Sequence, residues 1–452
     1  MDMRAFTKSM LTMPWALSMF SLQQAANLLS PSSTNRFDAA GRAMDDVAAA
    51  ASHDFDGWAR QTYEFGTTVQ QSLVDIMMLR PPAMDSGRLM RTVQEFQANP
   101  VFQAMMQYGM PPVGWAGSLL KNAKDGPAVG QEFNNKIYVI TLVTQVHAKL
   151  GLHDGTEHSL ATMVAKAAEM ETYPRLWAVE GIGNFIGDRA LSRDGDATTA
   201  LLTGPDAQDL GAWSMTMLHA GIGMSFAKYV LKTLKTDSPA SVVRDAISRF
   251  AVLCRASSRP GYAGAAYESL GLATRTLYPE FVRLIDAQIP DVEPELLGYY
   301  WHGVGRAMYF EPPNWMPFVN APWRAVGRIP IEAPHNTARK NLLSGVAWAL
   351  TMVNLRHPVV TETFLRHHGT LLSEDDAYTD GVTSSLTMRY DTTRDDAKVS
   401  PFIHHEPEGD ADLTALWRAL ITGPCEDALQ RQYPQLRAAN QLEEIFHYRA
   451  PR

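Results

Sequence analysis

The sequence has few of the features from which a function is most readily assigned. Only two of its 452 residues are cysteines, and neither lies in a CxxC or Cys/His spacing, which excludes a disulfide framework and a zinc finger. Positive charge is not in excess either, because 40 basic and 48 acidic residues give a formal net charge of −8. The basic surface that nucleic-acid binding requires is therefore not expected. We predict no nucleic-acid partner and a reducing, cytoplasmic location.

Long apolar runs are also missing. No segment offers the roughly 18 consecutive apolar residues of a membrane-spanning helix. The apolar stretch at residues 10–20 superficially resembles a signal peptide, but Pro14 and Ser18 interrupt it and no small-residue cleavage site follows. With Trp15 and Phe20 as anchors, it is equally suited to a lipid interface and to docking on the helices that follow. Peripheral association with a membrane or granule therefore stays open.

The usual motifs of catalysis and cofactor binding are absent from the sequence as well. It contains no GxSxG elbow, no Walker loop and no HExxH. The glycines of residues 181–187 superficially resemble a dinucleotide-binding loop, but the third glycine falls one place late and no clear strand precedes the first. We expect neither a cofactor nor a metal ion.

What the sequence does have is a short glycine pattern that returns six times. It reads Glu-Gly-Ile-Gly, His-Ala-Gly-Ile-Gly, Glu-Ser-Leu-Gly, His-Gly-Val-Gly, Ser-Gly-Val-Ala and Asp-Gly-Val-Thr. Steps of 32 to 50 residues separate its marker glycines, a spacing typical of stacked helical repeats. A glycine inside a helix costs about 1 kcal/mol relative to alanine, so we expect close helix packing to compensate. The markers are Gly181, Gly221, Gly271, Gly303, Gly345 and Gly381.

The pattern predicts a mainly α fold, either a helical repeat array or a closed α/α toroid with glycine-rich inner helices. An N-terminal amphipathic helical region (1–82) and a helical connecting region (83–172) would precede the glycine-rich repeat domain (173–390). A loop followed by helices (391–452) would complete the chain. In the connecting region, the run 137–146 has the β-branched content of a strand, but its length and flanks favour a helix.

Four polar residues occupy matching places in successive repeats, one to three residues before a glycine: Glu180, His219, Glu268 and His302. If the glycine helices form an inner layer, these side chains would meet in a common cavity, where carboxylate and imidazole groups suit acid–base catalysis. The alternative is structural. Each side chain would then form a hydrogen bond to a neighbouring helix end, and a repeat would reproduce such contacts automatically.

Arginines and aromatic residues lie beside the same elements. Arg259 and Arg306 would either pair with the carboxylates of this cluster or bind a carboxylate or phosphate group of a ligand. The aromatic residues would form the wall of a site for an extended apolar molecule, or they would simply pack in the core. These residues are Tyr262, Tyr267, Trp301 and Tyr309.

The glycine blocks also carry a resemblance to a family. Over about residues 173–390, their order and spacing resemble those of a family of unknown function that occurs beside enediyne polyketide synthases. Ala347 departs from this resemblance, because it stands where the family tends to have a further glycine. The blocks that carry the resemblance are Ala178–Gly183, His219–Ala227, Arg259–Tyr262 with Ala266–Gly271, His302–Phe310 and Arg339–Ala347.

A second resemblance concerns the N-terminal region. Residues 37–79 are similar in texture to phasins, the amphipathic helical proteins that coat polyester granules. Both resemblances imply a partner of apolar acyl or polyene character.

The resemblances lead to two hypotheses about function. We expect an accessory protein of polyketide or lipid-like secondary metabolism that binds a long apolar intermediate in an interior cavity. If it is an enzyme, acid–base isomerisation or cyclisation fits the residues best, with Arg259 and Arg306 orienting the polar groups or the ligand. The alternative is a non-enzymatic scaffold or surface-coat protein that attaches to a membrane or granule through its N-terminal helices. Amphipathic helices and an unclosed array would also favour a homo-oligomer.

Overall fold

The structure, a computed structural model, describes residues 126–144, 146, 150, 158–310 and 321–449, which belong to the unit 85–452 of the chain. These residues form helices joined by turns and contain no strand, so the predicted mainly α fold is confirmed. None of the helices in these ranges combines the length and apolarity needed to cross a membrane. The predicted N-terminal amphipathic region, 1–82, lies outside the described residues. The surface-coat hypothesis depends on this region and therefore stays a prediction.

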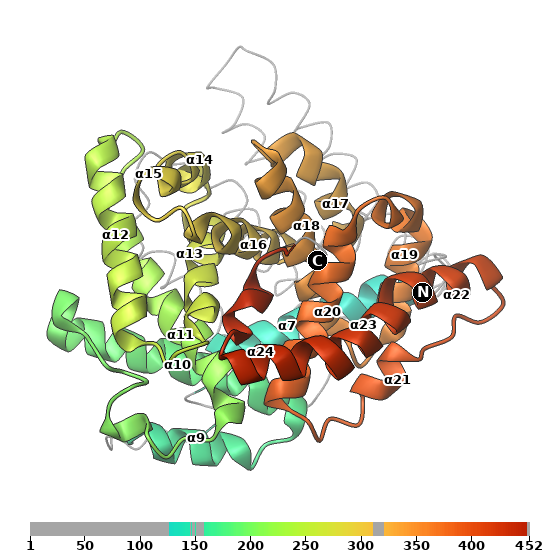
Figure 1. The fold of residues 1–452 in the computed structure, drawn as a ribbon, viewed down its shortest axis with the longest axis horizontal. Helices are drawn as coiled ribbons and strands as arrows, with labels where there is room; N and C mark the ends of the chain where they lie inside the picture. Colours follow the sequence, from blue (N-terminus) through green and yellow to red (C-terminus); the bar gives the residue numbers. More distant parts are fainter. Residues whose placement is uncertain (1–125, 145, 147–149, 151–157, 311–320, 450–452) are drawn as a thin grey trace, which may run out of the picture. The chain divides into compact units, whose positions relative to one another are not determined.

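The marker glycines lie on a series of helices that pack one after another in chain order. The most extensive contacts between the described helices join successive members of this series (Figure 1). Helix α11 also touches α20. The choice between a helical repeat array and a closed toroid stays a prediction. The helices are α10 (Thr172–Asp194), α11 (Ala212–Leu231), α13 (Ala263–Leu277), α16 (Leu296–Tyr309), α18 (Asn336–Asn354) and α20 (Asp376–Thr392).

Further helices connect and cover this series. For example, α12 packs on both α11 and α13, and α19 packs on both α18 and α20. The covering helices are α9 (Leu160–Ala168), α12 (Ala240–Ser257), α14 (Val282–Asp286), α15 (Ile289–Val292), α17 (Ala321–Glu332) and α19 (Pro358–Ser373).

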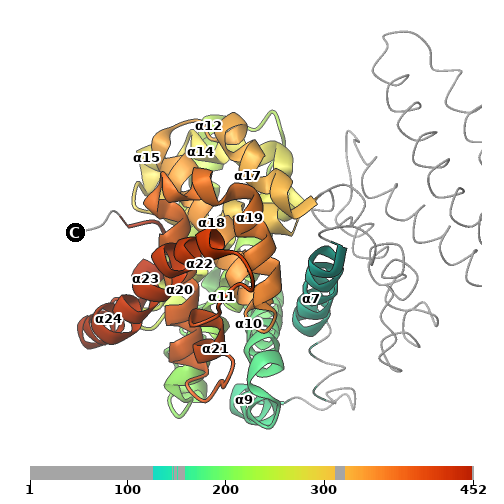
Figure 2. The same ribbon diagram turned by 90° about the vertical axis from the view of Figure 1, so that its right-hand side faces the viewer.

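The ambiguous run 137–146 lies mostly on a helix, α7 (Gly126–Thr144), as its length and flanks predicted. Figure 2 shows α7 alongside α10, and it also contacts α18 and α19. Buried residues on one side of α7, among them Val139 and Leu142, join the core that the glycine helices share. Helix α7 therefore packs on the glycine helices and contributes to their shared core.

The Gly-x-Gly spacing explains how one helix can approach two neighbours. Successive residues of an α-helix are about 100° apart, so residues i and i+2 lie on nearly opposite sides. On α11, a Cβ added to Gly221 would collide with the carbonyl oxygen of Glu180 on α10. A Cβ added to Gly223 would lie 2.6 Å from the Cα of Ala266 on α13. The two glycines thus allow close backbone contact on both sides of α11.

The same arrangement recurs on α16. A Cβ on Gly303 would collide with the carbonyl oxygen of Glu268 on α13, and a Cβ on Gly305 would collide with that of Leu342 on α18. On α18, Ala347 faces Gly381 of α20, and a Cβ added to Gly381 would lie 2.8 Å from the Cβ of Ala347. Close helix packing at the marker glycines is therefore present, as the sequence predicted.

The C-terminal part of the chain returns to the glycine helices. From Ala411 to Ala439 it is continuously helical, because π-helical turns at Arg418–Thr422 and Ala428–Gln432 join α22 (Ala411–Trp417), α23 (Gly423–Asp427) and α24 (Tyr433–Ala439). The short helix α21 (Val399–Ile403) precedes this rod, and a 3-10 turn, Leu442–Phe446, follows it.

The last described residues are tied to helices far away in sequence. Glu443 N–H donates to the carbonyl oxygen of Gly261 at 2.9 Å, and its Oε2 accepts from Ala263 N–H at 3.1 Å. Tyr448 N–H donates to Asn341 Oδ1 at 2.7 Å, and its hydroxyl donates to Asp376 at 2.7 Å. The end of the chain therefore bridges α13, α18 and α20.

Candidate functional site

Three of the four polar residues predicted to meet come together around Arg306. Arg306 Nη2 donates to Glu180 Oε1 at 2.6 Å, and Nη1 donates to Glu268 Oε2 at 3.0 Å. The other oxygen of Glu268, Oε1, lies 2.7 Å from His302 Nδ1. These contacts join α10, α13 and α16. We call Glu180, Glu268, His302 and Arg306 the buried quartet.

The helix packing brings the quartet together. His302 and Arg306 are four residues apart on α16, so they lie on the same face of the helix. The backbone of Gly303 approaches the carbonyl group of Glu268 closely, which places the side chains of Glu268 and His302 beside each other. The polar residue of each repeat is thus positioned by the glycine that follows it.

The quartet is enclosed in the protein. Glu268 and His302 are fully buried, and Arg306 and Glu180 are only 3% and 6% exposed. Burial by itself raises the pKa of Glu268, but the charge of Arg306 and the hydrogen bond from His302 outweigh it, so the pKa is lowered. Burial likewise opposes the charge of Arg306, but Glu180 and Glu268 prevail and raise its pKa. The contact between Glu268 and Arg306 is therefore between charged groups.

Some polar atoms of the quartet remain without a hydrogen-bond partner among the described residues. They include His302 Nε2 and Glu180 Oε2, both buried. The Arg306 guanidinium lies 4.7 Å from the ring centroid of Trp348, whose Nε1 is also without a partner in this part of the chain. Buried polar atoms normally have partners, so these atoms keep hydrogen-bonding capacity that the described residues do not use.

The quartet has the chemistry of a histidine base held by a carboxylate. Because Glu268 is ionised, His302 Nδ1 carries the proton of their hydrogen bond, and neutral His302 then has its lone pair on Nε2. Glu268 thus orients the His302 ring and leaves Nε2 as the atom that can accept a proton.

The last two repeats contain a similar pair that was not among the predicted site residues. Ser344 Oγ donates to Asp380 Oδ2 at 2.8 Å, and each of these residues directly precedes a marker glycine. Burial raises the pKa of Asp380, which the Ser344 hydrogen bond and the charge of Arg449 partly oppose. The repeat pattern itself was the signal that could have found this pair.

His219, the fourth predicted residue, is held by backbone groups. Its Nδ1 lies 2.7 Å from the carbonyl oxygen of Met215, and its Nε2 accepts from Arg259 N–H at 3.0 Å. The ring is fully buried and stacks on Tyr262 at 5.3 Å between centroids. Both ring nitrogens are thus engaged in the neutral form. This is the structural alternative that the sequence left open, and a catalytic role for His219 stays a prediction.

The buried imidazole of His219 leads to a prediction about acid stability. Burial lowers its pKa to about 4 from an ordinary 6.5, partly opposed by the Met215 carbonyl. The unfolded chain therefore binds the extra proton first, so stability is complete above pH 6.5 and falls as the pH drops towards 4. Between pH 7 and pH 5 we expect a loss of about 2 kcal/mol in the free energy of unfolding from this residue.

Urea unfolding at several pH values measures this effect. Between pH 7 and pH 5, the free energy of unfolding of His219→Gln should fall by about 2 kcal/mol less than that of the native protein. His404→Gln changes an exposed histidine and should show the same slope of unfolding free energy against pH as the native protein. An unchanged slope in His219→Gln would mean that this residue does not bind the additional proton on unfolding.

Arg259 and Tyr262 were predicted to contact a ligand, and the structure shows contacts within the protein. Arg259 Nε donates to the carbonyl oxygen of Leu202 at 2.8 Å, and its Nη2 donates to that of Ala207. Arg259 therefore holds the connection between α10 and α11. The hydroxyl of Tyr262 accepts from Arg437 Nη1 at 2.5 Å, which ties α24 to the start of α13. Their ligand-binding role stays a prediction.

The other predicted aromatic residues lie at three different places. Tyr267 packs edge-on against Tyr299 at 5.7 Å, and burial raises its pKa to about 12. Trp301 Nε1 donates to Asp286 Oδ1 at 2.7 Å. The hydroxyl of Tyr309, one turn after Arg306, accepts from Asn354 Nδ2 at 2.8 Å. These contacts do not establish that the predicted aromatic residues form one common wall for a ligand.

Sequence reasoning missed a second buried charge cluster. Glu132 and Lys136 on α7 form an ion pair at 3.2 Å with both side chains almost completely buried. Glutamate four residues before lysine is usually a solvent-exposed helix pair, which is why it attracted no notice. The available signal was the apolar run that follows directly, Ile137–Ile140, which favours burial of α7.

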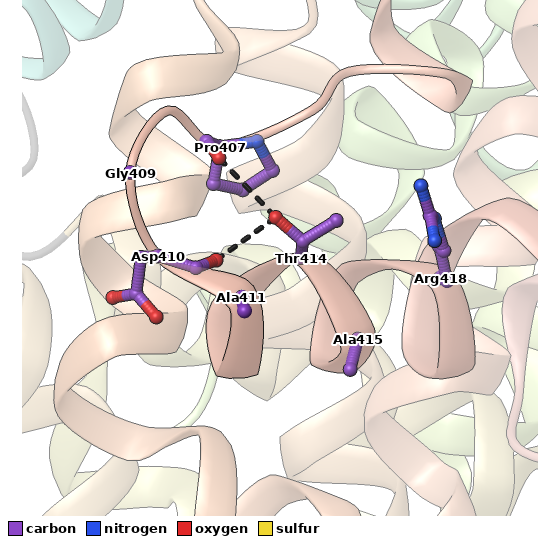
Figure 3. A pocket seen from close by; sticks show the side chains of 7 residues that line it. All are labelled: Pro407, Gly409, Asp410, Ala411, Thr414, Ala415 and Arg418. Atoms are coloured by element: carbon purple, nitrogen blue, oxygen red, sulfur yellow. Dashed lines mark hydrogen bonds between the residues drawn. The ribbon is translucent and has the colours of Figure 1, made fainter.

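The described residues show a surface hollow that shares no residue with the quartet, and they show no metal site. Within the described ranges, no group of three or more His, Cys, Asp or Glu side chains is placed to hold a metal ion. The pocket in Figure 3 is an open surface hollow of about 490 Å³ at the start of α22, where the Thr414 hydroxyl lies 2.9 Å from the carbonyl oxygen of Asp410. The hollow is lined by Pro407, Gly409, Asp410, Ala411, Thr414, Ala415 and Arg418.

Comparison of the chain with family models, with curated proteins and with solved structures gives no match in any of the three. The resemblance of the glycine blocks to the enediyne-associated family therefore stays a prediction, and the functional argument depends on the side chains.

Proposed function

We propose that this protein binds an apolar acyl or polyene molecule and catalyses its isomerisation or cyclisation by acid–base chemistry at the buried quartet. The apolar character of the ligand comes from the family resemblance. The reaction type comes from the residues, because a histidine with a paired carboxylate transfers protons without a cofactor.

One observation carries the proposal: His302 Nε2 is buried and has no hydrogen-bond partner among the described residues, while Nδ1 is held by Glu268. A purely structural histidine in a core normally uses both nitrogens, as His219 does. His302 keeps one nitrogen available, and its orientation is set by the carboxylate on the other side of the ring.

In the proposed reaction, His302 Nε2 takes a proton from a carbon atom next to a conjugated or carbonyl group. The imidazolium that results is stabilised by Glu268, and it returns the proton to another carbon atom of the same molecule. Arg306 keeps Glu268 ionised and oriented, and Glu180 holds Arg306 from the opposite side. The substrate thus gains and loses one proton, so that no other reactant is needed.

Native mass spectrometry of gently purified protein, followed by solvent extraction, tests binding and identifies the bound compound. That compound, added back to ligand-free protein in D₂O, should then take up deuterium. We expect His302→Gln to slow this exchange about 100-fold or more, because an amide cannot act as the base.

His404→Gln, which changes an exposed histidine, is the matched control and should exchange like the native protein. Binding without exchange would reject the reaction and keep the binding function. Equal exchange in His302→Gln and the native protein would reject the role of the quartet. A protein that carries no extractable compound would reject both parts of the proposal.

A further inference from the structure

The segment that follows α24 crosses several of the glycine helices. Residues 440–449, which we call the strap, contain the 3-10 turn, and this turn packs on α13, α16 and α20. The strap begins at Asn440, which has a left-handed backbone with a φ of 53° and terminates α24. The change of direction at this residue separates the strap from the rod formed by α22, α23 and α24.

The strap lies over a side chain that touches the buried quartet. The ring centroid of Phe446 is 6.3 Å from that of Trp348. On its other contacts, the Trp348 ring is 6.3 Å from the ring of His302 and 4.7 Å from the guanidinium of Arg306. A single side chain, Trp348, therefore connects the strap with the quartet.

The strap also reaches the Ser344–Asp380 pair. Arg449 N–H donates to Asp380 Oδ1 at 3.5 Å, while Ser344 Oγ donates to the other oxygen of the same carboxyl group. Ser344 and Trp348 are four residues apart on α18, so they lie on one face of this helix. The strap thus covers two neighbouring places on the face of α18 that meets the quartet.

Polar contacts near the surface hold the end of the strap. The Tyr448 hydroxyl donates to Asp376 at 2.7 Å and accepts from Lys340 Nζ at 2.8 Å, and these two partners have side chains that are 35% and 24% exposed. Water can replace such contacts, so releasing them costs less free energy than separating the glycine helices. Because Phe446 is only 1% exposed, the closed strap remains the more stable state.

The quartet itself is enclosed, so a molecule reaches His302 Nε2 only when part of the fold opens. We propose that the strap is a lid, closed in this structure, that opens locally and admits a ligand to the quartet beside Trp348. The proposal rests on the proposed function, since it takes the quartet as the site that the ligand must reach. The opening itself is measurable without that ligand.

Chemical modification of His302 tests the lid, with diethyl pyrocarbonate as a probe that acylates a free imidazole nitrogen. Peptide mass spectrometry gives the rate at His302 in the full-length protein. Labelling of the buried Cys254 on α12 with N-ethylmaleimide reports global unfolding. Tyr448→Phe removes one attachment of the strap, so we expect His302 to react about 10-fold faster while labelling of Cys254 keeps its native rate.

Tyr173→Phe is the matched control, because it also removes one hydroxyl hydrogen bond, to the carbonyl oxygen of Val353 at 2.9 Å, but lies on α10 and outside the strap. It should change the rates at His302 and Cys254 by the same factor. If Tyr448→Phe left the rate at His302 unchanged, or accelerated both sites equally, the lid would be rejected.

Hydrogen exchange of the native protein supplies a second measurement without any substitution. The amide of Tyr448, which donates to Asn341, should exchange faster than the amides within α16. Exchange of this amide together with those of α16 would show that the strap is a fixed part of the core and would overturn the proposal.

The lid and the proposed function fail in different ways. A bound compound that takes up deuterium, together with a strap that does not open, would reject the lid and keep the reaction at the quartet. A strap that opens in a protein without any extractable compound would support the lid and reject the proposed function.

Discussion

Gly271→Ala is expected to destabilise the protein by about 3 kcal/mol, although alanine is the better helix former. The Cβ would collide with the carbonyl oxygen of Tyr300 on α16 and would lie 2.8 Å from Val304 N. Backbone atoms of two packed helices cannot rotate away as a side chain does, so the helices must separate. The midpoint of thermal or urea unfolding measures the effect.

Gly327→Ala is the matched control for this experiment. Gly327 also lies inside a helix, α17, but an added Cβ would have no atom within 4 Å. Alanine should therefore increase the stability slightly, by up to about 1 kcal/mol. If both substitutions had the same effect, close packing at the marker glycine would not be what determines stability.

Arg306→Met is expected to cost about 3–5 kcal/mol, because it leaves the carboxylates of Glu180 and Glu268 buried without their shared cation. Methionine fills much of the same volume, so the loss would come from charge and not from a cavity. The free energy of unfolding at pH 7 is the quantity to compare.

Two further variants test the cause of that loss. Arg328→Met removes a partly exposed arginine, paired with Glu332 on α17, and should change stability by less than about 1 kcal/mol. In Arg306→Met, the additional changes Glu180→Gln and Glu268→Gln should restore most of the stability by removing the unpaired charges. Failure of this rescue would show that Arg306 acts mainly through its packing on Trp348.

Much of the fold follows from the sequence because glycine has few reasons to recur inside helices. Gly221 and Gly303 lie where their helices approach the preceding helix of the series. The second glycine of each Gly-x-Gly pair, such as Gly305, lies where the same helix approaches the following one. Helix contacts in chain order follow from such a repeat. Closure of the array does not, because it depends on the sum of many small crossing angles that no single residue records.

The site was predictable where the repeat determined it and not elsewhere. Glu180, Glu268 and His302 come together as predicted, and Arg306 pairs with the two carboxylates, one of the two roles foreseen. His219 has the same position in its repeat, but the backbone of Arg259 reaches its second nitrogen. That contact comes from a connecting segment outside the repeat pattern.

The bridge made by Glu443 and Tyr448 has a consequence for synthesis in the cell. Glu443 and Tyr448 leave the ribosome long after Gly261, Ala263 and Asn341, which they bind. The ends of α13 and α18 therefore stay uncovered while the residues between Asn341 and Glu443 are being synthesised. A chain that stops after α20 would contain every glycine helix and still offer an unfinished surface to proteases and chaperones.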